Sequence, residues 1–292
     1  MIWILMLLMA MLDPNRMLPG RAGTPGADGS GQGVSIPIDP PSADARGPLP
    51  PVTAARGADA PLVVIDPGHG GRDPGATSQF SRVPEKEITL ALARAIRDGL
   101  AATGRVRVAL TRDDDRYLVL QERYEIARRL GADLFISIHA DTAPANDAAR
   151  GATIYTLSEV ASDREAAQLA QRENRTDLIA GARLSPDPNV NVILIDLAQR
   201  ESMNVSADFA RLLHREAAPV FPFRPDWHRF AAFIVLKAPD IPSILFESGY
   251  LTNPVDAAYL QSPQGQAQIA DGMRRAIEAH FARRFIATRG RA

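Results

Sequence analysis

The sequence predicts an α/β domain built on a single mixed, mostly parallel β-sheet flanked by helices. Short apolar, β-branched runs typical of buried strands alternate along the chain with stretches in which apolar residues recur every three to four positions, as in amphipathic helices. This alternation favours a largely buried sheet covered by helices. Between residues 162 and 213 the pattern changes to two helical stretches, which predicts a helical insertion in the sheet order.

The expected elements follow from this pattern. The expected strands lie at residues 62–65, 106–110, 134–138, 153–157, 232–236 and 243–246. One helix is expected to begin at residue 85. Four more are expected at residues 118–130, 163–180, 197–213 and 264–284. The helix that begins at Glu85 has the clearest pattern, because apolar residues recur every four positions from Ile88 to Leu100 and form one buried face.

Composition narrows the classes of function and of metal site. A chain of 292 residues is long enough for one large domain or two modest ones. The formal net charge of −1 provides no basic excess to neutralise phosphates, so we expect no nucleic-acid partner. The absence of cysteine excludes disulfides and thiolate zinc sites, so any metal must be bound by His, Asp or Glu. We expect a monomer.

The first sixty residues lie outside the expected domain. Residues 1–12 are strongly apolar but too few to span a bilayer, and they resemble the hydrophobic region of a signal peptide. Residues 13–60 are dense in Pro, Gly, Ala, Asp and Ser and lack periodic apolar residues, which predicts a disordered linker. We therefore expect an exported protein whose folded domain covers residues 61–286.

Two of the five histidines directly follow apolar strands. His69 lies in the string DPGHGG after the first strand, and His139 lies in the string SIHAD after the third. Reacting groups gather beyond the carboxyl ends of strands in α/β sheets, so the two imidazoles could converge on one metal. The alternative for each is a hydrogen-bonded loop residue. The remaining histidines are weaker candidates: His214, His228 and His280.

Two glutamates are candidates for the same site. Glu85 begins a helix, where its carboxylate would either interact with the helix N-terminus or provide a third metal ligand. Glu247 ends a very apolar strand, where a carboxylate is costly unless it is paired or used. Burial would raise the pKa of Glu247, which suits a general base acting on water. A buried salt bridge is the alternative.

Five strings in order resemble the zinc-dependent N-acetylmuramoyl-L-alanine amidases of the amidase type 3 family. They are VVIDPGHGGRDPGA, PEKEITLALARAI, TRDDDRYLVLQERYEIAR, FISIHAD and PSILFESGYLTNP, and the resemblance runs from about Leu62 to the C-terminus. It implies a single zinc ion bound by His69, Glu85 and His139, with Glu247 as the catalytic glutamate. The implied reaction cuts peptidoglycan between N-acetylmuramic acid and the L-alanine of the stem peptide.

The insertion at about residues 160–213 resembles a segment of the periplasmic cell-division amidases. In those relatives a helix lies over the active site and blocks it until an activator with a LytM-like domain displaces it. The resemblance implies autoinhibition here, with Glu165 or Glu173 as the residue that reaches the zinc. It also implies a periplasmic location and a role in cell-wall remodelling and daughter-cell separation. The alternative for the insertion is a plain surface helix.

Three other readings remain open at the level of sequence. A zinc peptidase or deacylase could act on a different amide. A non-catalytic wall-binding module could keep the fold, although all four candidate residues are present. A purely structural α/β domain would leave Glu247 unexplained.

Overall fold

The computed structural model describes residues 47–57, 59–143, 146, 148–179 and 192–289. Six strands form one sheet in the order β2-β1-β3-β6-β4-β5. Their bounds are β1 Leu62–Pro67, β2 Arg107–Leu110, β3 Leu134–Asp141, β4 Ala152–Leu157, β5 Phe223–Ala231 and β6 Ser243–Tyr250. Strands β2, β1, β3 and β6 are parallel, whereas β4 runs antiparallel to β6 and β5 runs parallel to β4. The predicted mixed, mostly parallel sheet is confirmed.

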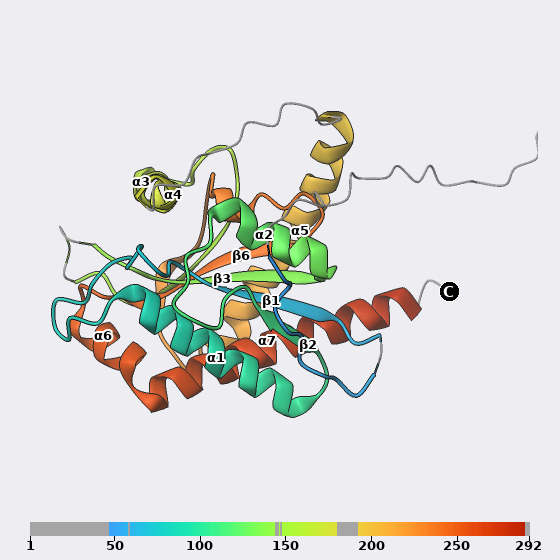
Figure 1. The fold of residues 1–292 in the computed structure, drawn as a ribbon, viewed down its shortest axis with the longest axis horizontal. Helices are drawn as coiled ribbons and strands as arrows, with labels where there is room; N and C mark the ends of the chain where they lie inside the picture. The colour runs from blue at the N-terminus through green and yellow to red at the C-terminus, as the bar shows by residue number, and fades with distance from the viewer. Residues whose placement is uncertain (1–46, 58, 144–145, 147, 180–191, 290–292) are drawn as a thin grey trace, which may run out of the picture. The chain divides into compact units, whose positions relative to one another are not determined.

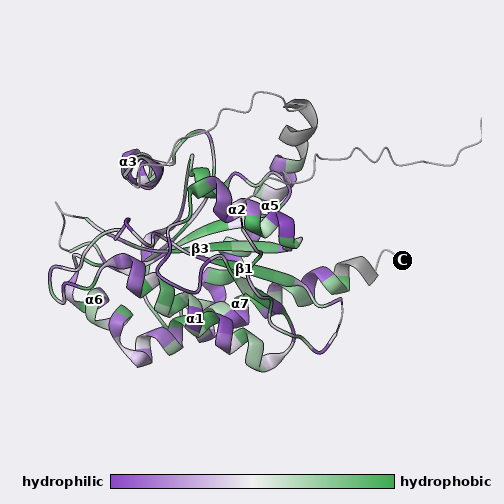
Figure 2. Ribbon diagram, viewed as in Figure 1, coloured by the Kyte–Doolittle hydropathy of each residue, from purple (hydrophilic) through white to green (hydrophobic). Residues whose placement is uncertain are grey.

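Helices cover both faces of the sheet (Figure 1). They are α1 Glu85–Thr103, α2 Leu120–Leu130, α3 Arg164–Glu173, α4 Thr176–Ile179, α5 Val192–Ala217, α6 Pro254–Gln261 and α7 Pro263–Arg289. The buried faces of α1, α5 and α7 pack against one face of the sheet, and α2 and α3 pack against the other. Apolar strands therefore lie between helices that carry polar outer faces, as Figure 2 shows for β1 and β3.

Two expectations about the second half of the domain were wrong. The apolar run at 232–236 is not a strand: Ile234–Leu236 forms a 3₁₀ turn, η1, whose Val235 and Leu236 are buried. The strand that was not predicted is β5, whose sequence FRPDWHRFA mixes polar and apolar residues. This edge strand pairs only with β4 and needs no continuous apolar pattern. Helix α6 was not expected, although Asn253 caps it by accepting hydrogen bonds from the backbone of Val255 and Asp256.

The first helix of the insertion is shorter than predicted. The stretch expected as one helix over 163–180 breaks after Glu173 into α3 and α4. At the break, the side chain of Asn174, the C-cap residue of α3, donates to the backbone oxygen of Ala232 at 2.8 Å and accepts from the backbone nitrogen of Ile234 at 2.8 Å. Helix α5 covers the second expected helix, and residues 180–191 lie outside the described residues.

The segment before β1 contacts the edge of the sheet. The backbone nitrogen of Thr53 donates to the oxygen of Val108 in β2 at 2.8 Å, and the nitrogen of Val108 donates to Thr53 Oγ1 at 2.9 Å. Contacts with the domain thus begin upstream of the expected boundary at residue 61. The apolar segment 1–12 and residues 13–46 of the expected linker lie outside the described residues. Within the described part of the chain, no helix is both long and apolar enough to cross a membrane.

Candidate active site

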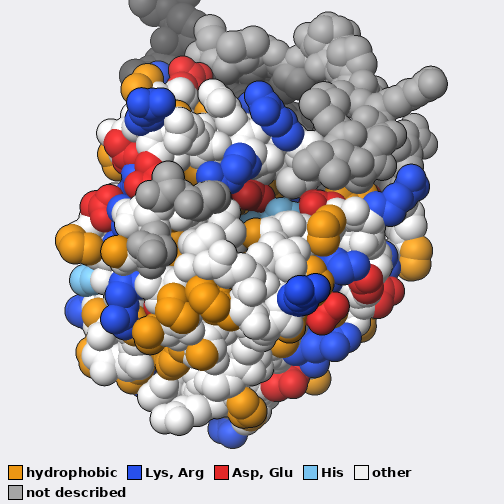
Figure 3. Space-filling model, turned by 90° about the vertical axis from the view of Figure 1, so that its left-hand side faces the viewer, with side chains coloured by type: hydrophobic (Ala, Val, Ile, Leu, Met, Phe, Trp, Pro, Cys, Tyr) orange, Lys and Arg blue, Asp and Glu red, His pale blue; other side chains and the backbone are white. Residues whose placement is uncertain are grey.

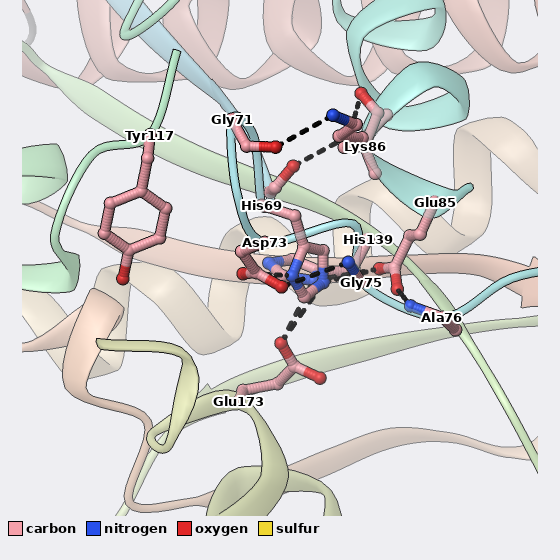
Figure 4. A network of polar contacts seen from close by, with 12 residues as sticks. His69, Gly71, Asp73, Gly75, Ala76, Glu85, Lys86, Tyr117, His139 and Glu173 are labelled. Carbon is pink, nitrogen blue, oxygen red and sulfur yellow. Dashed lines mark hydrogen bonds and ion pairs between the residues drawn. The ribbon is translucent and has the colours of Figure 1, made fainter. Parts of the chain in front are cut away.

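The parallel strands place three of the sequence-predicted residues at one edge of the sheet. His69 follows the carboxyl end of β1, and His139 lies near the end of β3. Glu247 of β6 is the register partner of His139 on the neighbouring strand. The fourth residue, Glu85, begins α1 and points back at both histidines (Figure 4). The sheet topology therefore brings together all four residues that the motifs single out.

The two imidazoles and Glu85 form a tight buried cluster. The ring centroids of His69 and His139 lie 4.9 Å apart. Glu85 Oε1 lies 3.1 Å from His69 Nε2 and 3.2 Å from His139 Nδ1, so it faces one ring nitrogen of each histidine. Backbone amides hold this carboxylate, because Ala76 donates to Oε2 at 2.9 Å and Ala140 donates to Oε1 at 3.0 Å. Glu85 is consequently fixed in place before any ligand binds.

Glycines let the loop after β1 approach the cluster closely. A Cβ on Gly68 would lie 2.4 Å from the ring of His139. A Cβ on Gly75, whose φ is +66°, would lie 2.6 Å from His69 and 2.7 Å from Glu85. His69 itself adopts a φ of 61°, which is rare for a residue with a side chain. The sequence signal for these close approaches was the density of glycine around His69.

Buried arginines fix the backbone of this loop. Arg123 donates to the backbone oxygens of Pro67 and His69 at 2.9 Å each and forms a 3.0 Å ion pair with the buried Asp66. Arg112, fully buried, donates to the oxygens of Pro67 at 3.0 Å and Gly68 at 2.8 Å. The loop that carries His69 is thereby held in its strained conformation by hydrogen bonds to its carbonyls.

Asp73 orients His69 and was missed at the level of sequence. Its Oδ2 lies 2.7 Å from His69 Nδ1, which leaves Nε2 facing Glu85. A carboxylate that accepts from one ring nitrogen and frees the other for a ligand is typical of metal-binding histidines. Burial disfavours the charged imidazole, but the carboxylates of Glu85 and Glu173 outweigh this effect and raise the pKa of His69 well above its usual range. The signal available was the Asp at position i+4 in a glycine-rich loop.

Glu247 is buried and leaves one oxygen unused. Its residue is 1% exposed, and Oε2 has no hydrogen-bond partner among the described residues. Burial, together with the nearby carboxylates of Asp141 and Glu85, raises the pKa of Glu247 well above its usual range. A buried carboxylate with an unused oxygen can accept a proton, which is what a general base does.

Of the two glutamates that were expected to reach the zinc, Glu165 and Glu173, only Glu173 reaches the cluster. Glu173 Oε2 lies 3.5 Å from His69 Nε2 and 3.4 Å from His139 Nδ1 (Figure 4). Its neighbour Arg172 forms a 2.7 Å ion pair with Asp141, a buried carboxyl whose pKa is raised by burial to about 6 although Arg172 opposes the shift. Glu165 lies at the other end of α3 and pairs with Arg224 at 2.7 Å.

A cavity of about 200 Å³ lies at this site, and its lining includes His69, Asp73, Glu85, Asp141, Arg172 and Glu173. The space-filling view shows histidine surface with acidic side chains beside it near the middle of the face, with Lys and Arg side chains around them (Figure 3). The cavity is therefore lined mainly by carboxylates, together with the imidazole of His69.

The donor set fits a zinc ion. Ligand atoms of His69, His139 and Glu173 all lie within 4.8 Å of one another, and Glu85 Oε1 lies closer still to both ring nitrogens. His69 Nε2 and Glu173 Oε2 are buried without a hydrogen-bond partner among the described residues. Two imidazoles and a carboxylate form a common zinc-binding set. A buried group of acidic oxygens around two imidazoles also favours a cation electrostatically.

The other three histidines lie elsewhere. His214 stacks on Trp227 with centroids 4.1 Å apart, and the Nε2 of His228 lies 3.1 Å from Thr156 Oγ1. His280 of α7 packs edge-on against Phe209 at 5.3 Å. None of the three joins the cluster.

Comparison with known proteins agrees with this geometry. The family profile described as N-acetylmuramoyl-L-alanine amidase matches residues 63–279. The chain belongs to this family. The family is one of amide-bond hydrolases, and its match extends from β1 into α7, across every residue of the cluster.

Two curated relatives illustrate the similarity of sequence. The chain is 34% identical over 234 residues to the N-acetylmuramoyl-L-alanine amidase AmiC of Escherichia coli O6:H1, covering 80% of this chain and 56% of that protein. It is 37% identical over 222 residues to AmiA of Salmonella typhimurium, covering 75% and 76%. The amidase-family chain thus spans little more than half the length of AmiC.

Solved amidase structures share the fold. The catalytic domain of CwlV from Bacillus (Paenibacillus) polymyxa var. colistinus matches with a TM-score of 0.57 and 26% identity, covering 76% of this chain and 98% of that one. AmiC2 of Nostoc punctiforme matches with a TM-score of 0.56 and 28% identity, covering 77% and 99%.

Proposed function

We propose that this member of the family hydrolyses the amide between N-acetylmuramic acid and the L-alanine of the peptidoglycan stem peptide. One observation carries the proposal: two imidazoles, a fixed carboxylate and a buried unpartnered carboxylate meet at the carboxyl edge of the sheet in a chain of this family. A purely structural role does not account for a buried Glu247 with an unused oxygen.

In this proposal His69, Glu85 and His139 hold a zinc ion. Zinc in such a site polarises an amide carbonyl and lowers the pKa of water. His69 presents Nε2 and His139 presents Nδ1, because these are the ring nitrogens that face Glu85. Asp73 keeps His69 in the required orientation through its 2.7 Å contact with Nδ1.

Glu247 moves the proton. Its unpartnered Oε2 accepts a proton from the attacking water, and the carboxylic acid then donates that proton to the leaving amide nitrogen. The high pKa of Glu247 suits both steps, since the group can hold the proton between them. The products are a glycan with a free lactyl carboxylate and a stem peptide with a free N-terminal amine.

Digestion of purified sacculi tests the activity. We expect release of intact stem peptides with a free alanine amine, identified by mass spectrometry, and no cleavage within the peptide. The intact chain and its Glu173→Ala variant should both be assayed, so that a site blocked by Glu173 does not hide the activity. Cleavage inside the stem peptide, or at acetyl groups of the glycan, would instead favour a peptidase or a deacylase.

We further propose that α3 holds the site shut. Glu173 faces one ring nitrogen of each histidine, and Arg172 pairs with Asp141. The buried apolar residues of α3 are only Ala166, Leu169 and Ala170, so few apolar contacts bind the helix to the domain. Its remaining attachments are polar contacts, among them the ion pairs of Glu165 with Arg224 and of Arg172 with Asp141.

Replacing Glu173 by Ala is expected to raise the basal rate of sacculus digestion by about tenfold or more. The reason is a population shift, because an open state that is rare in the intact protein becomes common when the blocking contact is lost. Dye release from labelled sacculi measures the rate. Gln171→Ala, which changes an exposed residue of the same helix, is the matched control and should leave the rate unchanged. An unchanged rate for a folded, zinc-loaded Glu173→Ala protein would contradict autoinhibition.

The setting of the enzyme follows from its substrate. We propose export to the periplasm, where peptidoglycan lies, and a role in remodelling the wall as daughter cells separate. A LytM-like activator is proposed to displace α3, with residues 160–213 as the regulatory insertion. Addition of such an activator should raise the rate of the intact chain and have less effect on the Glu173→Ala protein, because the contact to be broken is already absent.

A further inference from the structure

Two arginines of β5 bind the start of the blocking helix. Arg224 Nη1 lies 2.7 Å from Glu165 Oε1 and also bonds the hydroxyl of Tyr250. Arg229 Nη2 lies 3.3 Å from Glu165 Oε2, and its guanidinium pairs with Asp163, the N-cap residue of α3. Both arginine side chains are largely buried, 17% and 4% exposed, whereas that of Glu165 is 45% exposed. The arginines therefore belong to the domain, and their carboxylate partners belong to the helix.

Arg224 lies at the same edge of the sheet as the zinc-site residues. Because β5 and β4 run antiparallel to β6, the start of β5 is level with the end of β6. In register, Phe223 pairs with Ala152, and the next residue of β4, Thr153, pairs with Glu247. Two strand spacings thus separate the start of β5 from Glu247, about 10 Å. Along α3, eight residues separate Glu165 from Glu173, about 12 Å.

Displacement of α3 would remove most of the carboxylate partners of Arg224 and Arg229. In the closed structure two guanidinium groups face three carboxylates, those of Asp163, Glu165 and Asp226. When α3 leaves, only Asp226 remains, so the local charge changes from −1 to +1. Buried charges that lose their partners are costly. An anion that enters the open cleft would restore the pairing.

We propose that Arg224 and Arg229 form a subsite for a carboxylate of the stem peptide, which Glu165 occupies in the closed structure. The inference rests on the proposed amidase function. Arginine provides a planar pair of donors that matches a carboxylate, and the Tyr250 hydroxyl, which donates to Glu165 Oε1 at 3.3 Å, adds a third donor. In this proposal α3 places one glutamate at each part of the substrate site, Glu173 at the histidines and Glu165 at the arginines.

The distance between the catalytic residues and the two arginines indicates which carboxylate of the peptide would bind at the arginines. An extended α-linked chain advances about 3.3–3.6 Å per residue, and the γ-link of the second residue adds two further bonds to the path, so a subsite about 10–12 Å from the scissile amide lies at the third residue. In a stem peptide of L-Ala, γ-linked D-Glu and diaminopimelate, the carboxylates of the third residue lie at this distance. The α-carboxylate of the second residue is closer to the scissile amide.

A substrate-by-variant comparison tests the subsite. The substrates are muramyl tripeptides with free carboxylates, with an amide at the second residue, and with amides at the third. For each, kcat/KM is measured on Glu173→Ala and on the same protein carrying Arg224→Gln. We expect Arg224→Gln to lower kcat/KM about tenfold to a hundredfold for substrates with a free third-residue carboxylate, and to have little effect when that group is amidated.

The ratio of kcat/KM for free and amidated substrates shows whether Arg224 binds the substrate or only holds α3 in place. If Arg224 only holds α3, its loss alters the rate for all substrates equally and leaves the ratio unchanged, which would overturn the proposal. A ratio that changes only with amidation at the second residue would move the subsite to that carboxylate. Arg224→Lys should restore part of the discrimination. Arg105→Gln, at an exposed arginine of the opposite edge, is the charge-matched control.

Binding of the free tripeptide gives a readout that does not need turnover. Calorimetry on Glu165→Ala should show binding that weakens about tenfold or more with Arg224→Gln and with amidation at the third residue. If the proposed amidase function is wrong, none of the substrates will be hydrolysed, but the binding of the tripeptide can still be measured. Equal affinity of the tripeptide for Glu165→Ala and for the same protein carrying Arg224→Gln would reject the subsite.

Discussion

Glu247→Gln is expected to lower the rate of amide hydrolysis by about a hundredfold to ten-thousandfold, the range typical of a lost general acid–base group. Glutamine keeps the size of the side chain but cannot accept a proton from water at the atom that is now unpartnered, Glu247 Oε2. The comparison is made in the Glu173→Ala background, with release of dye from labelled sacculi as the measure of rate.

The variant is also informative about stability. Glu247 is fully buried near the carboxylates of Asp141 and Glu85, so an uncharged isostere removes repulsion and should leave the thermal midpoint unchanged or raise it. Zinc content should match that of the parent protein. Retention of hydrolysis within a few fold of the parent would remove Glu247 from the proposed mechanism.

Removal of zinc is expected to have a comparably large effect. Chelation should reduce hydrolysis about a thousandfold or more, since the metal supplies several kcal/mol of charge stabilisation in such reactions. The thermal midpoint should fall as well, because a ligand that binds only the folded state stabilises it. The cluster of Glu85, Glu173 and the two imidazoles would then lack the cation for which its buried, unpartnered atoms are suited.

His139→Ala should have the same outcome without a chelator. Elemental analysis should find little zinc in this variant, and added zinc should not restore its activity, whereas it should restore the chelated parent. The matched control is His214→Ala, because that imidazole stacks on Trp227 away from the cluster. Full activity in a zinc-free parent protein would refute the proposed metal site.

The sequence alone was sufficient for much of the fold. Buried strands such as β1 and β3 have continuous apolar runs, and α1 has a clear four-residue repeat, so their type and order could be predicted. The edge strand β5 could not be found in the same way. It pairs on one side only, and its arginines are buried by contact with α3, a segment about sixty residues earlier in the chain.

The sequence also determined the composition of the candidate site. Glycines around His69, histidines after two strands and a glutamate after a third are local features that can be read without coordinates. They identified His69, His139 and Glu247, which meet because parallel strands deliver their carboxyl ends to one edge of the sheet. Glu85, at the start of a helix, was a weaker candidate, and the family resemblance supplied its expected role.

Only the tertiary structure decided which residue blocks the site. Glu165 and Glu173 are both glutamates of one short amphipathic helix, and nothing local distinguishes them. The direction and position of α3 across the sheet place Glu173 within 3.5 Å of both histidines and leave Glu165 against the arginines of β5. The physical reason is that a helix orients its side chains by its docking, and that docking depends on contacts made far away in the sequence.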